Sequence, residues 1–412
     1  MKKMLIDKQI LEAQEEIVGI RREIHQLPEL MFDTFKTSKL VADKLRLFGV
    51  DEVVEGIGRT GVIGKIKGNK NTRNKVIALR ADMDALPVTE QTGLPYASKQ
   101  RTKYLGQDVG VMHACGHDAH VAILMGAAEF LAKNKKDLKG NIMLIFQPAE
   151  EGAPEGEGGG AELMLAEGIF ERYKPEVIFG LHVTNSRHGY LGVLPGPAMA
   201  AASSYRITVN GVQAHGSRPW DSVDPIMATA QLIESLNTVV SRRINIINNP
   251  AVISVGMVQA GTRNNIIPDK SQITGTIRTF DSDLRAEIYD EIRQIARGVA
   301  EGTGTKVNVE FDVGGFYPVT FNDVELTKKY SQTLSEAADG KFFLLDKPTT
   351  GAEDFSFFSQ KIPGMYFWLG VNEPGIDVAP GNHTPFFKVD DRALDEGVKA
   401  MIYLALDYAS NN

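Results

Sequence analysis

The sequence predicts an α/β protein with a mixed sheet, into which a smaller α+β module of ferredoxin-like order is inserted. Its 412 residues exceed the length at which a single hydrophobic core stops growing, so we expect two domains. Strand-like and helix-like segments alternate up to about residue 183, which is typical of a largely parallel or mixed sheet. Between residues 203 and 314 the segments follow the order β-α-β-β-α-β, which defines the module.

The alternating part begins with two helices. Apolar residues recur at helical spacing over residues 8–26, until Pro28 breaks the pattern, and a second helix over residues 37–47 is closed by Gly49. The segments that follow are strands in GVIGKIKG and KVIALRAD, a helix within HVAILMGAAEFLAKN, a strand in NIMLIFQ, a helix from Ala161 to Glu167, and a strand in VIFGLHV.

The module begins with SSYRITVNG, in which alternate residues are apolar, and this predicts a strand with one buried face. After it come a helix over about 222–242, strands in AVISVGMVQAG and SQITGTIRTF, a helix over about 283–301, and a strand in KVNVEFDVG. Polar motifs resume beyond the module, in TGAEDFSFF and GNHTPFF. We therefore expect a discontinuous first domain, residues 1–194 and 315–412, with residues 195–314 inserted into it.

Charge and composition exclude several classes of protein. The net charge of -7, with mixed signs, leaves no broad basic face for nucleic acid or anionic lipid. No apolar run approaches the roughly 18 residues that span a bilayer, and the opening MKKMLIDKQ lacks the apolar core of a signal peptide. We expect a cytoplasmic protein without nucleic-acid or membrane partners. Cys115 is the only cysteine, so no intrachain disulfide can form.

Residues that can bind a metal gather in the segments that end the predicted strands. In open α/β sheets, ligands bind beyond the carboxyl ends of the strands. The segments RADMDALP, MHACGHDAH, FQPAEEG, FGLHV and GNHTPFF contain Asp82, Asp84, Cys115, His117, Glu150, Glu151, His182 and His383. Thiolate, imidazole and carboxylate together suit a borderline-soft divalent ion.

The spacing of these residues predicts how they act together. The Cys-x-His spacing of Cys115 and His117 lets both reach one centre from an extended loop. Successive strand side chains point to opposite sides, so one of Glu150 and Glu151 can bind a metal while the other stays free as a base. Five candidate ligands exceed one tetrahedral site, so two metals that share a bridge, such as the Cys115 thiolate, fit better than one.

Each of these residues also has an ordinary interpretation. A lone cysteine is usually a small buried hydrophobic residue, and a histidine on an apolar strand, such as His182, is usually a core residue. Only the joint occurrence of the polar residues at strand ends favours a metal centre. His113 and His120 flank the ligand pair and are expected to support it or to lie at the surface, whereas His25 and His188 are expected to be structural.

The motifs MHACGHDAH, FQPAEEG, GLHV, TGAEDF and GNHTPFF resemble those of the dinuclear metallo-aminoacylase and carboxypeptidase family. RREIHQLPEL and LRADMDALPVTE belong to the same pattern, and the resemblance runs from about residue 18 to the C-terminus. The most similar branch holds N-acyl-amino-acid amidohydrolases, hippurate hydrolases and indole-acetyl-amino-acid hydrolases. The resemblance implies a zinc-peptidase-like catalytic domain and, for the inserted module, a lid and dimerisation domain.

The resemblance also implies a role for each residue of the centre. The ligands of two divalent ions, which would be manganese, zinc, cobalt or nickel, would be Cys115, His117, Glu151, His182 and His383. Glu150 would be the general base. Asp84 would orient a ligand without binding an ion itself, and so would Asp82, which stands where sister branches have a liganding histidine.

Within the module, the resemblance implies contacts with the substrate. His215 in QAHGS would stabilise the oxyanion, commonly in the partner subunit's active site, so a homodimer or a higher oligomer is expected. Without that pattern, His215 would be read as a surface histidine before a turn. Arg263 and Asn265 in GTRNNIIPD would contact the substrate's carboxylate, although Asn265 fits the cap of a turn equally well. Outside the module, Glu353 would line the pocket.

The implied reaction is the hydrolysis of an N-acyl amino acid to a carboxylic acid and a free amino acid by metal-activated water. Two alternatives use the same centre: a metallocarboxypeptidase or dipeptidase, and a deacetylase of an N-acetylated amino-acid biosynthesis intermediate. A non-catalytic metal-dependent binding protein is a third alternative, against which the intact Glu150 argues. Two features depart from the family pattern: Trp220 stands where close relatives often have a second histidine, and APEGEG lengthens the loop over residues 152–158.

Overall fold

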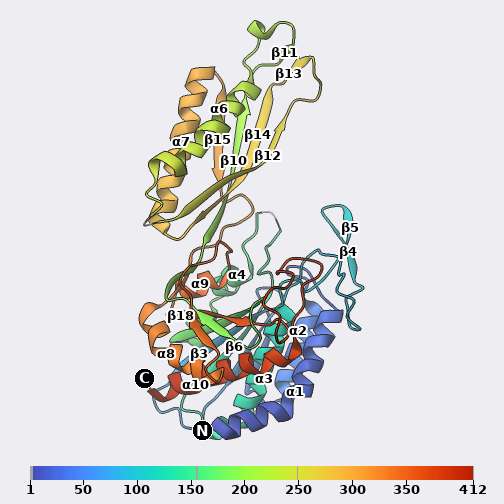
Figure 1. Cartoon of the computed structure of the whole chain (residues 1–412), viewed down its shortest axis with the longest axis vertical. Helices are drawn as coiled ribbons and strands as arrows, with labels where there is room; N and C mark the ends of the chain where they lie inside the picture. Colours follow the sequence, from blue (N-terminus) through green and yellow to red (C-terminus); the bar gives the residue numbers. More distant parts are fainter. Residues whose placement is uncertain (1–2, 155, 248, 412) are drawn as a thin grey trace.

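The computed structural model describes residues 3–154, 156–247 and 249–411, and it consists of a larger lower part and a module above it (Figure 1). The lower part is built on an eight-stranded mixed sheet with the strand order β1-β2-β6-β3-β7-β18-β8-β17. The bounds of these strands are β1 Glu52–Ile57, β2 Gly61–Ile66, β3 Val76–Asp82, β6 Asn141–Gln147, β7 Val177–Thr184, β8 Leu191–Val193, β17 Phe342–Leu344 and β18 Gly364–Gly370. Strands β6, β3, β7 and β18 run parallel to one another.

Helices cover both faces of this sheet. One face packs against α1 Lys3–Gln26, α2 Phe35–Leu47, α3 His117–Lys133, α8 Val324–Ala337 and α10 Leu394–Asn411. The other face packs against the shorter helices α4 Gly160–Ala166, α5 Ile169–Tyr173 and α9 Phe355–Ser359. No helix within the described residues has both the length and the apolar character needed to cross a membrane.

The central strand β3 shows why the sequence gives buried strands here. Ile77 and Leu79 point into the core under the long helices, whereas Val76 and Ala78 point into the core under the short ones. All residues of β3 are buried, so the strand reads as an almost continuous apolar run instead of an alternating one. Polar residues are then concentrated at its carboxyl end, where Asp82 is the last residue.

The upper module contains β10 Ala201–Asn210, α6 Pro225–Thr238, β12 Ala251–Ala260, β14 Lys270–Thr279, α7 Ser282–Thr303 and β15 Lys306–Phe311. This is the predicted β-α-β-β-α-β order. The sheet order is β12-β14-β10-β15, with every neighbouring pair antiparallel. Helices α6 and α7 pack on one face of the sheet around their own hydrophobic core. A short π-helix, Val239–Arg243, continues α6 to nearly the predicted end.

Short strands complete the fold. At the far end of the module, β11 Ala214–His215 pairs with β13 Ile266–Ile267 (Figure 1). Where the two parts join, β9 Gly196–Met199 pairs with β16 Thr320–Asn322. A separate hairpin of β4 Arg101–Tyr104 and β5 Gln107–Gly110 projects beside the gap between the two parts (Figure 1).

Candidate metal centre

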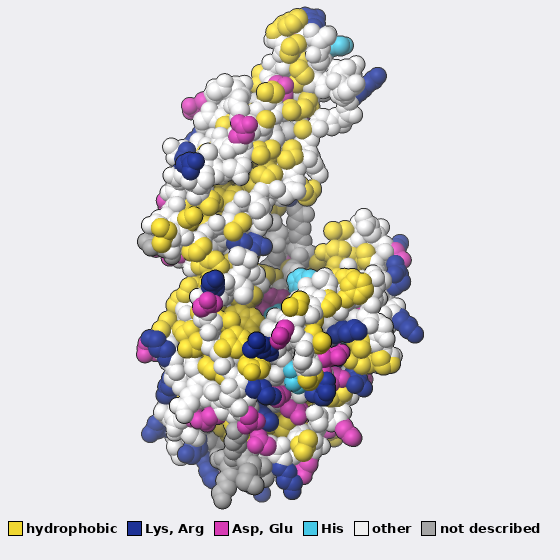
Figure 2. Space-filling view, in the orientation of Figure 1, with side chains coloured by type: hydrophobic (Ala, Val, Ile, Leu, Met, Phe, Trp, Pro, Cys, Tyr) yellow, Lys and Arg dark blue, Asp and Glu magenta, His cyan; other side chains and the backbone are white. Residues whose placement is uncertain are grey.

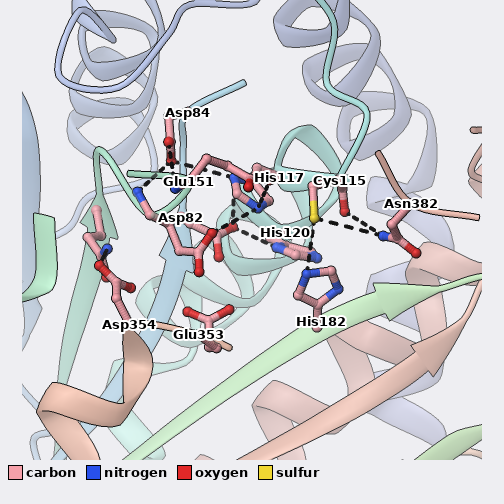
Figure 3. Close-up of polar contacts among 12 residues, drawn as sticks. Asp82, Asp84, Cys115, His117, His120, Glu151, His182, Glu353, Asp354 and Asn382 are labelled. Carbon is pink, nitrogen blue, oxygen red and sulfur yellow. Dashed lines mark hydrogen bonds and ion pairs between the residues drawn. The ribbon is translucent and has the colours of Figure 1, made fainter. Parts of the chain in front are cut away.

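The carboxyl ends of neighbouring strands position part of the candidate site. Because β6, β3 and β7 are parallel, their carboxyl ends lie at the same edge of the sheet. Asp82 ends β3, the pair of residues 150 and 151 follows β6, and His182 lies near the end of β7. His383 comes from the loop after β18. The sheet edge therefore brings together side chains from segments that are far apart in the sequence (Figure 3).

A glycine with a left-handed backbone separates Cys115 from His117. Gly116 has a φ of 92° and precedes α3 as its N-cap residue. A Cβ atom at this position would lie 2.2 Å from Val183 Cγ2, so any other residue would clash with the Val183 side chain in addition to straining the backbone. His383 also has a positive φ, 67°, although it carries a side chain. Such backbone strain is concentrated at functional sites.

Two imidazole rings contact the Cys115 sulfur. Sγ lies 3.3 Å from His182 Nε2 and 3.2 Å from His383 Nε2. His383 Nε2 is in turn 3.4 Å from Glu151 Oε1. The His383 side chain is 55% exposed, so this group of ligand atoms opens toward solvent.

A second group of ligand atoms surrounds His117, which is completely buried. Its Nε2 atom is 3.8 Å from Glu151 Oε1 and 3.9 Å from Glu150 Oε2. Glu151 Oε1 thus adjoins both groups. The ligand atoms of Cys115, His117 and His182 also lie within 4.8 Å of one another. Cys115 and Glu151 therefore each belong to two groups of candidate ligand atoms.

The polar atoms of this centre need cations. Both ring nitrogens of His117, and Glu151 Oε1, are buried with no hydrogen-bond partner among the described residues. Burial and the carboxylates of Glu151 and Glu150 hold the pKa of the Cys115 thiol well above its usual range. Burial and the neighbouring carboxylates, Glu353 first, likewise raise the pKa of Glu150. Divalent ions relieve all of these costs at once, and thiolate, imidazole and carboxylate are ligands that such ions accept.

Asp84 fixes the Glu150–Glu151 pair. Its carboxylate accepts the backbone N–H of Glu150 at 2.9 Å and that of Glu151 at 3.0 Å. Asp84 Oδ1 also lies 3.6 Å from His117 Nδ1. This single buried carboxylate thereby links the β6 loop to the first residue of α3.

His120 and Asp82 support the centre without offering a free ligand atom. His120 Nε2 accepts the Val183 N–H at 2.9 Å, so its proton lies on Nδ1, which donates to Asp82 Oδ1 at 2.6 Å. The His120 ring stacks on His117, with ring centroids 5.3 Å apart, and its edge contacts His182 at 4.8 Å. His120 is thus buried between two candidate ligands and does not lie at the surface.

Arg80, which was not predicted as a site residue from the sequence, pairs with three carboxylates behind the centre. Its guanidinium is fully buried and lies 2.6 Å from Asp82, 2.9 Å from Glu353 and 2.7 Å from Asp354. Glu353 Oε2 also accepts the Tyr366 hydroxyl at 2.6 Å. Both oxygens of Glu353 are therefore already paired, and its expected contact with substrate stays a prediction. The sequence does contain a sign of this residue, because an arginine inside the apolar run VIALRAD must be buried with a partner.

A buried ionic network lies behind the loop that carries the ligands. Arg21 Nε donates to Asp118 Oδ2 at 3.0 Å, and His25 Nδ1 lies 2.8 Å from the same oxygen. Asp118 follows His117 directly, so the network fixes the first turn of α3. His113 is buried next to His25, and burial lowers its pKa to about 3, which keeps this imidazole neutral.

Three of the expected site residues lie elsewhere. His215 is in β11, and Arg263 and Asn265 precede β13, so all three lie at the far end of the module (Figure 1). They are neighbours there, because Gly216 N–H donates to the Asn265 carbonyl at 2.8 Å. In Figure 2, histidine side chains reach the surface where the lower part faces the module, and another lies at the module's tip. One chain in this conformation therefore does not bring the two groups together.

Comparisons with known proteins agree with this geometry. Residues 78–407 match the model of peptidase family M20/M25/M40. The chain is 40% identical to thermostable carboxypeptidase 2 of Saccharolobus solfataricus, over 97% of both chains. It is 38% identical to hippurate hydrolase of Campylobacter jejuni, over 97% of this chain and 98% of that one.

A solved structure shares the fold as well as the sequence pattern. The crystal structure of a dinuclear metal-binding peptidase of the M20 family from Bacillus subtilis aligns with a TM-score of 0.79 and 33% identity. The alignment covers 97% of this chain and 99% of that one. With the paired ligand groups described above, this likeness supports two divalent ions per chain. The chain belongs to peptidase family M20/M25/M40 and is a metal-dependent hydrolase of amide bonds.

Proposed function

We propose that the chain hydrolyses N-acyl amino acids to a carboxylic acid and a free amino acid. The observation that supports this most directly is the contrast between the adjacent residues Glu150 and Glu151. Glu151 Oε1 lies 3.4 Å from His383 and 3.8 Å from His117, so it adjoins both ligand groups. The Glu150 carboxylate adjoins only the second group, at 3.9 Å from His117, and its other neighbours are the carboxylates of Glu353 and Asp354. Within the described residues no side chain pairs with Glu150 at hydrogen-bonding distance. One carboxylate is thus positioned to bind an ion and the other to move a proton.

In the proposed reaction, Glu150 takes a proton from the attacking water and returns it to the nitrogen of the leaving amino acid. Two divalent ions held by Cys115, His117, Glu151, His182 and His383 would supply the Lewis acidity that activates water and polarises the carbonyl. Asp84 holds the two glutamates in register through their backbone N–H groups. The ions would be zinc, manganese, cobalt or nickel, in keeping with the mixed donor set. A reduced cysteine among the ligands favours a cytoplasmic enzyme.

We propose that His215 donates the hydrogen bond that stabilises the oxyanion. Its Nδ1 atom accepts the Ser217 N–H at 3.1 Å and lies 2.8 Å from the Ser217 hydroxyl. In the neutral ring the proton is therefore on Nε2, which is exposed and free to donate. Arg263 and Asn265, its exposed neighbours, would hold the substrate's carboxylate. With these proposed roles, residues 1–194 and 315–412 would form the catalytic domain and residues 195–314 a lid.

A homodimer through the lid would bring these residues to the partner's metal centre. β12 is an edge strand of the module sheet, paired with β14 alone among the described strands. Along its length Val252 is 43%, Met257 55% and Val258 48% exposed. A long edge strand with apolar side chains is a surface that native proteins normally cover. A second copy of the chain fits this role, and Met257→Asp should shift the protein toward the monomer in light scattering.

The direct test of the proposed function is a hydrolysis screen. The apo protein is refilled with each of the four metals and offered N-acetyl, N-benzoyl and indole-acetyl amino acids, together with dipeptides that carry a free α-amine. Cleavage of the acylated compounds but not of the dipeptides supports the proposal. The reverse preference would indicate a carboxypeptidase or dipeptidase, which the carboxypeptidase relative at 40% identity makes the second candidate.

A mixing experiment tests the donation by His215 across the dimer. Glu150→Gln and His215→Ala should each be nearly inactive, because removal of a base or of an oxyanion donor costs about 10²-fold or more in kcat. Mixed under conditions of subunit exchange, the two variants should regain activity, since one site of each heterodimer contains both residues. Heterodimers without activity would exclude donation across the dimer.

A further inference from the structure

Trp220 is an exposed aromatic residue whose position the proposed reaction leaves unexplained. It lies in η2, Pro219–Asp221, and its side chain is 75% exposed. The turn that carries it is firmly built. Arg218 N–H donates to the His215 carbonyl at 2.8 Å, and Val212 and Val223 exchange backbone hydrogen bonds that close residues 212–223 into a loop. An ion pair between Arg218 and Asp221, 2.8 Å long, joins the residues on either side of Pro219 and Trp220.

Backbone hydrogen bonds place two different segments on the two edges of the strand that leads to His215. The hydrogen bonds of Val212 go to Val223, within this loop. On the opposite edge, Gly211 N–H donates to the Asp269 carbonyl at 2.8 Å, and His215 pairs with Ile266 of β13. The backbone that carries His215 thus lies between the end of the Trp220 turn, at Val223, and the segment that contains Arg263 and Asn265.

This arrangement matches the three groups around the carbonyl carbon of an N-acyl amino acid. That carbon bears an oxygen, the nitrogen of the amino acid and the acyl substituent. If His215 meets the oxygen, and Arg263 with Asn265 meets the amino acid's carboxylate, the remaining acyl substituent lies on the side of Trp220. A flat, exposed indole at that position can stack on an aromatic acyl group but gains little from a methyl group.

We propose that Trp220 binds the acyl group and that the preferred substrates carry an aromatic acyl group, such as benzoyl or indole-acetyl. This rests on the proposed function, in which the tip of the module closes over a metal centre. Trp220 determines specificity and takes no part in the proton transfers. The amino-acid side of the substrate is recognised by other residues, so replacing Trp220 should change the preference for the acyl group and not that for the amino acid.

The test compares two substrates that release the same amino acid. The ratio of kcat/KM for N-benzoyl-alanine to that for N-acetyl-alanine should fall by about 10- to 100-fold in Trp220→Ala, because the aromatic contact is lost for one substrate only. Trp220→Phe should keep most of the ratio. Leu105→Ala removes another exposed apolar side chain, 87% exposed in the β4–β5 hairpin, and should leave the ratio unchanged. Equal losses on both substrates, or a changed preference for the amino acid instead of the acyl group, would overturn the proposal.

A binding measurement separates this proposal from the proposed function. Trp220 is one of two tryptophans, so the fluorescence difference between the metal-loaded Glu150→Gln protein and the same protein with Trp220→Phe reports on its indole. N-benzoyl-alanine should change this difference signal and N-acetyl-alanine should not. If no N-acyl amino acid is hydrolysed but the benzoyl compound still changes the signal, the proposed reaction is wrong and the binding role of Trp220 stands. An unchanged signal with both compounds overturns the role of Trp220, whether or not hydrolysis occurs.

Discussion

Replacing Asp84 tests whether a carboxylate that binds no ion controls the metal centre. Asp84 accepts two backbone N–H groups, from Glu150 at 2.9 Å and from Glu151 at 3.0 Å, in a buried position. Hydrogen bonds to a charged group contribute about 1.5–3 kcal/mol each, so Asp84→Ala removes about 3–6 kcal/mol from the loop after β6. If only about 1.5 kcal/mol of this loss weakens metal binding, the metal affinity already falls roughly tenfold.

We expect Asp84→Ala to lower metal affinity by about 10- to 100-fold, the range typical for residues that orient ligands. Asp84→Asn should be intermediate, because its one oxygen accepts one N–H while its amide nitrogen faces the other donor. Affinity is measured by competition with a chelator, and kcat at saturating metal. As a control, Asp281→Ala removes a similar backbone acceptor, the cap of α7 that accepts Leu284 N–H at 2.8 Å, and should lower stability but not metal affinity. Wild-type affinity in both Asp84 variants would refute the reasoning.

Three further predictions concern single residues. Glu150→Gln should lower kcat by at least about 10²-fold while metal content, measured by elemental analysis, stays near wild type; loss of metal instead would show that Glu150 is a ligand. Cys115→Ser should lower metal occupancy after dialysis, and alkylating agents should label Cys115 much faster in apo than in holo protein; equal labelling rates would contradict a ligand role. Burial lowers the pKa of His25, but Asp118 outweighs it and raises this pKa to about 9. The contribution of protonated His25 to the free energy of unfolding is therefore complete below the unfolded-state pKa of about 6.5. This contribution, at most about 3 kcal/mol, is lost as pH rises through 9. Denaturant titrations from pH 6 to 10 should show this loss in wild type and not in His25→Gln.

The sequence predicts the buried strands well because their signal is local. β3, β6 and β7 are apolar on both faces, and each is followed by or ends in polar residues. Polar residues directly after a buried apolar run indicate a functional site. The inserted module could be predicted equally well, since β10 alternates buried and half-buried residues along its length. Helices α8 and α10 were not predicted, although apolar residues recur in them at helical spacing. Strands of three or four residues, such as β8 and β16, are too short to show any alternation.

The supporting residues of the centre could not be predicted in the same way. Arg80 acts through Asp82, two positions away, and through Glu353 and Asp354, more than 270 positions away. No local pattern encodes such a contact, and a lone arginine in a strand is equally typical of an edge position. His120 illustrates the same limit: only the hydrogen bonds to Asp82 and Val183 show that neither of its nitrogens is free.

Because the two groups of site residues are separate, mutations in each group should have different effects on activity and substrate preference. The candidate ligands, Glu150 and Asp84 lie at one edge of the sheet, and in the proposed reaction they would act on every substrate, because any amide bond needs the same activated water. His215, Arg263 and Trp220 lie at the tip of the module, outside the contacts of the centre. In the proposed reaction each of them would meet a different part of one substrate. Variants of the sheet edge should therefore lower kcat/KM uniformly across acyl and amino-acid groups. Variants of Arg263 and Trp220 should change ratios between substrates, and a variant of His215 should lower kcat for all of them while metal content stays constant. If a His215 variant changed only the ratios between substrates, His215 would determine specificity, and its proposed role in stabilising the oxyanion would be wrong.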